Sequence, residues 1–106
     1  MVFSGKTVIV TGGAQGIGKA IVSAYVNEGA TVVIADIDEQ KGKETAEEYG
    51  ATFIKTDVKN HKDVIKLMET VKHTTGRIDI VINNSGVSRF KSLYELTVEE
   101  WDDILQ

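Results

Sequence analysis

A glycine-rich segment near the N-terminus of this 106-residue chain combines residue types and spacing that indicate chemistry. Residues 11–18 read TGGAQGIG, between a β-branched run and an apolar helical pattern. In such a loop Gly12 would allow a tight turn, Gly16 a close approach of backbone to phosphate, and Gly18 close packing of a helix on a strand. The free N–H groups and positive dipole of a helix N-terminus favour an anion. The segment therefore predicts a site for a dinucleotide pyrophosphate.

The glycine spacing by itself leaves a second interpretation open. The glycines stand at positions 12, 13, 16 and 18, so the literal G-x-G-x-x-G spacing is absent. A glycine loop alone is a weak signal, because a tight strand-to-helix turn that binds nothing needs similar residues.

Asp36 strengthens the nucleotide interpretation. It closes the second predicted strand, 18 residues after Gly18. A carboxylate at that distance would accept hydrogen bonds from the adenosine ribose hydroxyls and would repel a 2′-phosphate. Neither Gln15 nor Ile37 supplies a cation for a 2′-phosphate. We therefore expect NAD rather than NADP, with the alternative that Asp36 only caps the turn after the strand.

The elements that must position these residues follow from hydrophobic periodicity. Short apolar, β-branched runs alternate with helical patterns along the chain. The predicted strands are residues 6–11, 31–36, 51–55 and 78–83. The order βαβαβαβα predicts an α/β fold with about four parallel strands joined by right-handed helical crossovers.

Four helices are expected between and after these strands. The first has an apolar stripe and ends at Gly29; the stripe comprises Ile17, Ala20, Ile21, Ala24 and Tyr25. Asp38 and Asn60 are the predicted N-caps of the second and third helices, and Gly50 and Gly76 their C-terminal stops. The third helix has its own apolar face, made of Val64, Leu67, Met68 and Val71.

The fourth helix is expected at the C-terminal end of the chain. Thr97 and Glu100 have the spacing of a capping box, and Leu96 and Trp101 that of a hydrophobic staple.

Three motifs resemble those of the short-chain dehydrogenase/reductases. Residues 11–18 resemble that family's T-G-x-x-x-G-x-G loop, and residues 83–86 (NNSG) its N-N-A-G motif after the fourth strand. Residues 56–58 (TDV) resemble the segment with its adenine-contacting Asp. The resemblance covers essentially the whole chain and implies a Rossmann-type doubly wound parallel sheet over residues 1–106.

The resemblance also implies a set of cofactor-binding residues: Gly12, Gln15, Gly16, Ile17, Gly18, Asp36, Asp57, Val58, Asn84, Ser85 and Gly86. Backbone at the loop residues would line the pyrophosphate site. Asp57 would face the adenine amino group with Val58 beside the ring, and Asn84 would approach the cofactor ribose. Asn83 would brace neighbouring backbone, and Ser85 replaces the usual Ala of the family.

The catalytic signature of the family is not found. Its members move a hydride between nicotinamide and an alcohol or carbonyl carbon, with a Ser and a Tyr-x-x-x-Lys pair. Gly29, Phe53 and Val98 stand four residues after the three tyrosines. We therefore expect the N-terminal, cofactor-binding half of an enzyme, with no catalytic residue and no activity alone. The parent enzyme would act on a small-molecule alcohol or carbonyl compound and form a homo-oligomer.

A truncated sheet has a physical consequence. The fourth strand would lack its usual neighbour, which leaves Ile80 and Ile82 on an uncovered edge. An open edge pairs readily with another chain, so self-association is expected.

Composition excludes several other classes of function. The formal net charge is −4, with no cluster of Lys or Arg, so a nucleic-acid partner is not expected. The longest apolar run is residues 32–35, too short to cross a membrane, and no secretory signal is visible. With no cysteine and no matching ligands for His61 or His73, no metal site is expected. These features favour a cytoplasmic protein.

Two other functions compete with the dehydrogenase hypothesis. A nucleotide-binding module without catalysis would use the same loop and the same acidic residue. A methyltransferase-like α/β domain also has a glycine loop and a ribose-binding acid, but it gives no role to residues 83–86.

Overall fold

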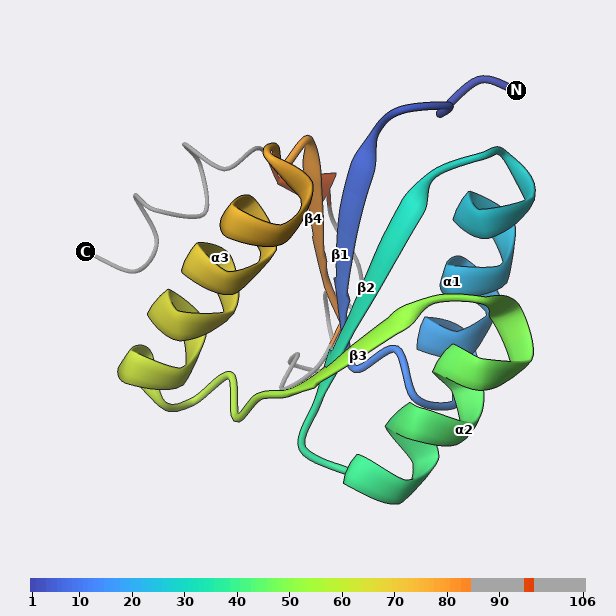
Figure 1. Ribbon diagram of the computed structural model, residues 1–106. Helices are drawn as coiled ribbons and strands as arrows, with labels where there is room; N and C mark the ends of the chain where they lie inside the picture. The colour runs from blue at the N-terminus through green and yellow to red at the C-terminus, as the bar shows by residue number, and fades with distance from the viewer. Residues whose placement is uncertain (85–94, 97–106) are drawn as a thin grey trace.

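Four parallel strands form the centre of the molecule in the computed structural model, which describes residues 1–84 and 95–96 (Figure 1). The strands are β1 (Thr7–Thr11), β2 (Thr31–Asp36), β3 (Thr52–Lys55), β4 (Ile80–Asn83) and a short β5 (Glu95–Leu96). Their order in the sheet is β3-β2-β1-β4-β5, and only β5 is antiparallel to its neighbour. The predicted α/β, Rossmann-like fold is confirmed.

Helices cover both faces of this sheet. They are α1 (Gly16–Asn27), α2 (Glu39–Tyr49) and α3 (His61–Thr75). Figure 1 shows α1 and α2 on one face and α3 on the other. Alternate residues of β1 point to opposite faces, so that Val8 and Val10 pack with Val22 of α1 and Ile9 packs with Leu67 of α3. Burial on both faces explains why every residue of β1 is buried.

The predicted apolar face of α3 is confirmed, whereas that of α1 was wrong by about one position. In α3, Val64, Leu67 and Val71 are buried and Met68 packs against them. In α1, Ile21 and Tyr25 do pack on the core, but the fully buried residues are Gly18 and Val22. Ile17, Ala20 and Ala24 are exposed. The helix is rotated because Gly18, rather than Ile17, lies against the loop after β1.

Local sequence signals at the ends of α2 and α3 are confirmed. The Asp38 side chain accepts a hydrogen bond from Lys41 N at 3.0 Å, and that of Asn60 accepts one from Asp63 N at 3.1 Å. Gly50 and Gly76 end these helices with φ of 71° and 82°, the left-handed conformation that glycine adopts at least cost.

The expectation of an uncovered edge on β4 was wrong. In the register of β5 against β4, Leu96 lies opposite Val81 and Glu95 opposite Ile82. Ile82 is only 4% exposed, and Ile80 is half-buried. A short antiparallel strand from the chain itself therefore occupies the edge that was expected to be open. The helix predicted from Thr97 lies outside the described residues.

A carboxylate joins the starts of β1 and β4. Asp79 N donates to Thr7 O at 2.9 Å, and Thr7 N donates to Asp79 Oδ2 at 2.8 Å. Arg77 donates to both carboxylate oxygens of Asp79, and its hydrogen bonds hold the pKa of that carboxyl below its usual range. The ionised form of Asp79 thus closes the strand pair at the edge of the sheet where the parallel strands begin.

We expect Asp79→Asn to lower the free energy of unfolding at pH 7 by about 1 kcal/mol, because it removes a charge from a half-exposed set of hydrogen bonds. A group with a lowered folded pKa stabilises the protein above its unfolded pKa, about 3.9 for Asp. This stabilisation is lost as pH falls through the folded pKa. Urea unfolding should therefore separate wild type and variant at pH 7, and the difference should shrink near pH 3.

Glu39→Gln is the matched control, because the Glu39–Lys43 ion pair is exposed on α2. This variant should unfold like wild type at pH 7. A difference between wild type and Asp79→Asn that persists unchanged at low pH would contradict a role for the ionised carboxylate.

Candidate functional site

The predicted site residues come together at one edge of the sheet. The glycine loop follows β1, and Asp36 is the last residue of β2. Asp57 lies two residues after the end of β3, and Asn84 directly follows β4. Thr11 is opposite both Ala35 and Asn83, and Asp36 is opposite Lys55, so the four parallel strands end level with one another. Ligands of open α/β sheets bind at this carboxyl edge.

The glycine loop leaves a set of backbone donors free. Gly12 and Gly16 have φ of 67° and 63°, and a Cβ on Gly18 would overlap the carbonyl oxygen of Gly12. The first hydrogen bond of α1 runs from Lys19 N to Gln15 O at 3.4 Å. Within residues 1–84 and 95–96, no acceptor is bound by the N–H groups of residues 15–18. Four unpaired N–H groups at a helix N-terminus form an anion-binding arrangement.

The carboxylate of Asp36 is fixed by the loop and by the turn after β2. Its Oδ2 accepts a hydrogen bond from Ala14 N at 3.2 Å, and its Oδ1 accepts one from Asp38 N at 2.9 Å. Asp36 therefore caps its own turn and also binds the glycine loop, 22 residues away in sequence. Each oxygen of an ionised carboxylate has two lone pairs, so both oxygens keep acceptor capacity for hydroxyl groups.

The side chains at the end of β4 hold β1 and the loop. Asn84 Nδ2 donates to Gly12 O at 3.1 Å, and Asn84 N donates to Thr11 Oγ1 at 2.9 Å. The Thr11 hydroxyl lies 3.0 Å from Asn83 Oδ1, to which it donates. The side chain that braces backbone in the structure is thus Asn84, whereas Asn83 meets a side chain. Ser85 and Gly86 lie outside the described residues.

Asp57 and Val58 lie in the turn between β3 and α3, where both are half-buried. Asp57 Oδ1 accepts a hydrogen bond from Lys59 N at 3.0 Å, and Asp57 N donates to Asp63 Oδ2 at 3.0 Å. The turn is therefore held by side chains at the same edge of the sheet as Asp36.

The structure draws attention to two residues that were given no binding role from the sequence. Ile37 follows Asp36 and is 62% exposed, although it is a large apolar residue. Thr45 of α2 is buried and donates from Oγ1 to Ala14 O at 2.6 Å. An apolar residue directly after the acid of β2 was a visible signal for Ile37. Thr45 had none, because its contact spans 31 residues and depends on how α2 packs.

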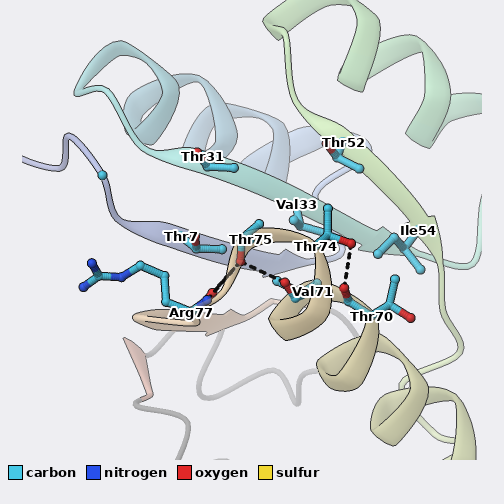
Figure 2. A pocket seen from close by; sticks show the side chains of 11 residues that line it. Thr7, Thr31, Val33, Thr52, Ile54, Thr70, Val71, Thr74, Thr75 and Arg77 are labelled. Carbon is cyan, nitrogen blue, oxygen red and sulfur yellow. Dashed lines mark hydrogen bonds between the residues drawn. The ribbon is translucent and has the colours of Figure 1, made fainter.

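A cavity of about 500 Å³ lies at the opposite edge of the sheet, between the starts of the strands and α3. Figure 2 shows threonines of the strands facing threonines of α3 across it. Thr7 lines this cavity and is 2% exposed, and its hydroxyl has no hydrogen-bond partner among the described residues. None of the predicted site residues borders the cavity.

Comparison with known proteins identifies the family. The family model for short chain dehydrogenases matches residues 6–106, and the chain belongs to this family. An L-fucose dehydrogenase from Oryctolagus cuniculus is 42% identical over 106 residues, which cover 98% of this chain and 37% of that protein. An NADP-dependent (R)-specific alcohol dehydrogenase from Lentilactobacillus kefiri is 38% identical over 105 residues, which cover 95% of this chain and 42% of that protein.

A solved structure agrees with this assignment. A short chain dehydrogenase from Bacillus anthracis superimposes with a TM-score of 0.69 at 35% identity, covering 73% of this chain and 34% of that one. The chain spans about two fifths of the length of the curated relatives that it matches.

Within residues 1–84 and 95–96, no helix has the length and apolar character needed to cross a membrane. No group of three or more acidic or histidine side chains there has an arrangement that would hold a metal ion.

The two buried threonines at the ends of β1 should respond in opposite ways to loss of the hydroxyl. We expect Thr11→Val to lower the free energy of unfolding by about 1–3 kcal/mol, because Asn84 N would lose its acceptor. Thr7→Val should leave stability unchanged or slightly raised, because a hydroxyl without a protein partner is replaced by a methyl group of similar volume. Urea unfolding of both variants measures the difference.

Thr11→Ser serves as a rescue variant, because it keeps the hydroxyl. Equal destabilisation by Thr7→Val and Thr11→Val would contradict this assignment and would indicate that water in the cavity binds the Thr7 hydroxyl.

Proposed function

We propose that this chain is the NAD-binding half of a short-chain dehydrogenase/reductase whose substrate is a small-molecule alcohol or carbonyl compound. The observation that carries the proposal is the junction of Asp36 with the glycine loop. A carboxylate and four unpaired backbone N–H groups lie beside one another, which matches the alternation of ribose hydroxyls and phosphates in a dinucleotide.

The pyrophosphate would bind at the start of α1. The N–H groups of residues 15–18 offer hydrogen bonds and the helix dipole favours negative charge there. Gly16 has no atom within 4 Å of a Cβ built on it, so a phosphate would meet backbone without a side chain between them. Gly12 and Ile17 would border the same site, and Ile17 is 58% exposed.

Asp36 supports NAD as the preferred cofactor. The Asp36 carboxylate retains acceptor capacity for two ribose hydroxyls, and it would repel a 2′-phosphate by charge. Family membership leaves this choice open, because the Lentilactobacillus kefiri relative is named as NADP-dependent. The preference therefore rests on the charge at residue 36 of this chain.

The adenine would lie between the turns after β2 and β3. Exposed Ile37 offers an apolar surface for the flat ring, and Asp57 and Val58 occupy the neighbouring turn. Asn84 would lie toward the nicotinamide ribose. When bound, the nicotinamide would supply hydride transfer. This chain would bind and orient the dinucleotide.

The acid–base chemistry of the enzyme is not assigned to these residues. Proton transfer requires a positioned side chain with a suitable pKa, and none of the three tyrosines has a lysine four residues later. The second candidate function is a nucleotide-binding module without catalysis, which would use the same glycine loop and the same Asp36 carboxylate. A homo-oligomeric parent enzyme remains part of the first proposal.

The choice of cofactor predicts a difference in thermal stability. A ligand that binds only the native state at a hundredfold excess over Kd adds about 2.7 kcal/mol. For a domain of this size that raises Tm by about 10 °C or more. NAD should produce this shift, and NADP at the same concentration should produce a clearly smaller one. In Asp36→Asn the two shifts should become similar, because the charge that opposes the 2′-phosphate is removed.

Asp38→Asn is the matched control, because Asn also caps a helix and the charge of Asp36 remains. This variant should keep the wild-type preference. Equal shifts of wild type by NAD and NADP would contradict the role of Asp36, and a melt that neither dinucleotide alters would contradict the nucleotide site.

A further inference from the structure

Thr45 connects the second helix to the candidate pyrophosphate loop. It lies near the middle of α2, is 3% exposed, and donates from Oγ1 to Ala14 O at 2.6 Å. Ala14 is itself 2% exposed, and its N–H is bound by Asp36 Oδ2. Two side chains from different elements thus hold the carbonyl and the N–H of one loop residue.

This contact fixes the direction of the next backbone donor. A trans peptide is planar, with its C=O and the following N–H pointing in opposite directions. Because the Ala14 carbonyl points toward α2, the N–H of Gln15 must point away from α2. Rotation of this peptide plane would bury the Gln15 N–H and would break the bond to Thr45.

The same contact lies directly before the start of α1. In a helix extended by one residue, Ala14 O would accept the N–H of Gly18. That carbonyl is instead directed toward Thr45 Oγ1, and the first helical hydrogen bond runs from Lys19 N to Gln15 O. The Gly18 N–H is left unpaired among the described residues. Thr45 therefore maintains two of the four free donors, those of Gln15 and Gly18.

We propose that Thr45 is a positioning residue for the pyrophosphate site, which it shapes without touching the ligand. The inference rests on the proposed function, since it assigns the free N–H groups to a dinucleotide. It goes beyond that function by placing a determinant of phosphate affinity on α2, in the packed interface with the loop.

The test compares Thr45→Val, which removes the hydroxyl, with Thr45→Ser, which keeps it. Thr70→Val is the matched control, because Thr70 is exposed on α3 at the other end of the sheet. Backbone amide NMR titrations of the chain with ADP-ribose and with adenosine separate the pyrophosphate from the nucleoside. We expect Thr45→Val to weaken ADP-ribose binding about tenfold, the effect of one lost hydrogen bond, and to leave adenosine binding within twofold.

Thr45→Ser should bind ADP-ribose within about threefold of wild type, and Thr70→Val should match wild type. Unchanged ADP-ribose affinity in Thr45→Val would overturn the inference. Equal weakening of both ligands with no rescue by serine would also overturn it, since that pattern indicates a general packing defect.

Amide hydrogen exchange without ligand tests the geometry separately from the proposed function. In Thr45→Val the freed Ala14 carbonyl should bind Gly18 N–H and slow its exchange about tenfold. If wild type binds neither ADP-ribose nor adenosine, the nucleotide proposal fails, whereas this exchange result still reports on Thr45. Unaltered exchange at Gly18 would overturn the geometric role.

Discussion

The close contact between Gly18 of α1 and the carbonyl of Gly12 is the constraint on which the carboxyl edge of the sheet depends. A Cβ at position 18 would overlap that carbonyl oxygen and would also approach Asn84 Nδ2 to 2.8 Å. Because this face of α1 must lie inward, Ile17 is directed outward beside the loop, and the helix N-terminus is brought to the end of β1. The placement of the free N–H groups follows from this packing contact.

Polar side chains then bind other backbone groups of the glycine loop. Asn84 takes the carbonyl of Gly12, Thr45 the carbonyl of Ala14, and Asp36 the N–H of Ala14. Buried backbone groups need partners, and these side chains supply them from β4, α2 and β2. What is left over is the run of donors at the start of α1. The loop is therefore held by contacts of the fold itself, an arrangement that would lower the ordering cost of binding an anion.

Features that depend on local sequence were predictable, and those that depend on contacts across the fold were not. Local sequence predicted the N-caps at Asp38 and Asn60 and the helix ends at Gly50 and Gly76. It also predicted the approximate positions of the four strands and the apolar face of α3. The predicted buried face of α1 was wrong because the close contact of Gly18 with Gly12 outweighed the spacing of the apolar residues. The pairing of β5 with β4 and the bond from Thr45 to Ala14 join distant segments and have no local signature.

The backbone groups at the amino and carboxyl edges of the sheet are hydrogen-bonded in different ways. At the amino edge, the Asp79 carboxylate accepts hydrogen bonds from the backbone N–H of Thr7 and from the Arg77 side chain, and a threonine-lined cavity lies beside them. At the carboxyl edge the side chains satisfy the inward-facing groups and leave the outward donors free. Thr7 and Thr11, at the two ends of one buried strand, show the contrast, since only Thr11 uses its hydroxyl to hold the neighbouring strand. The asymmetry follows from the parallel order of the strands, which gathers all the loops that lead into helices at one edge, where helix N-termini can face an anion.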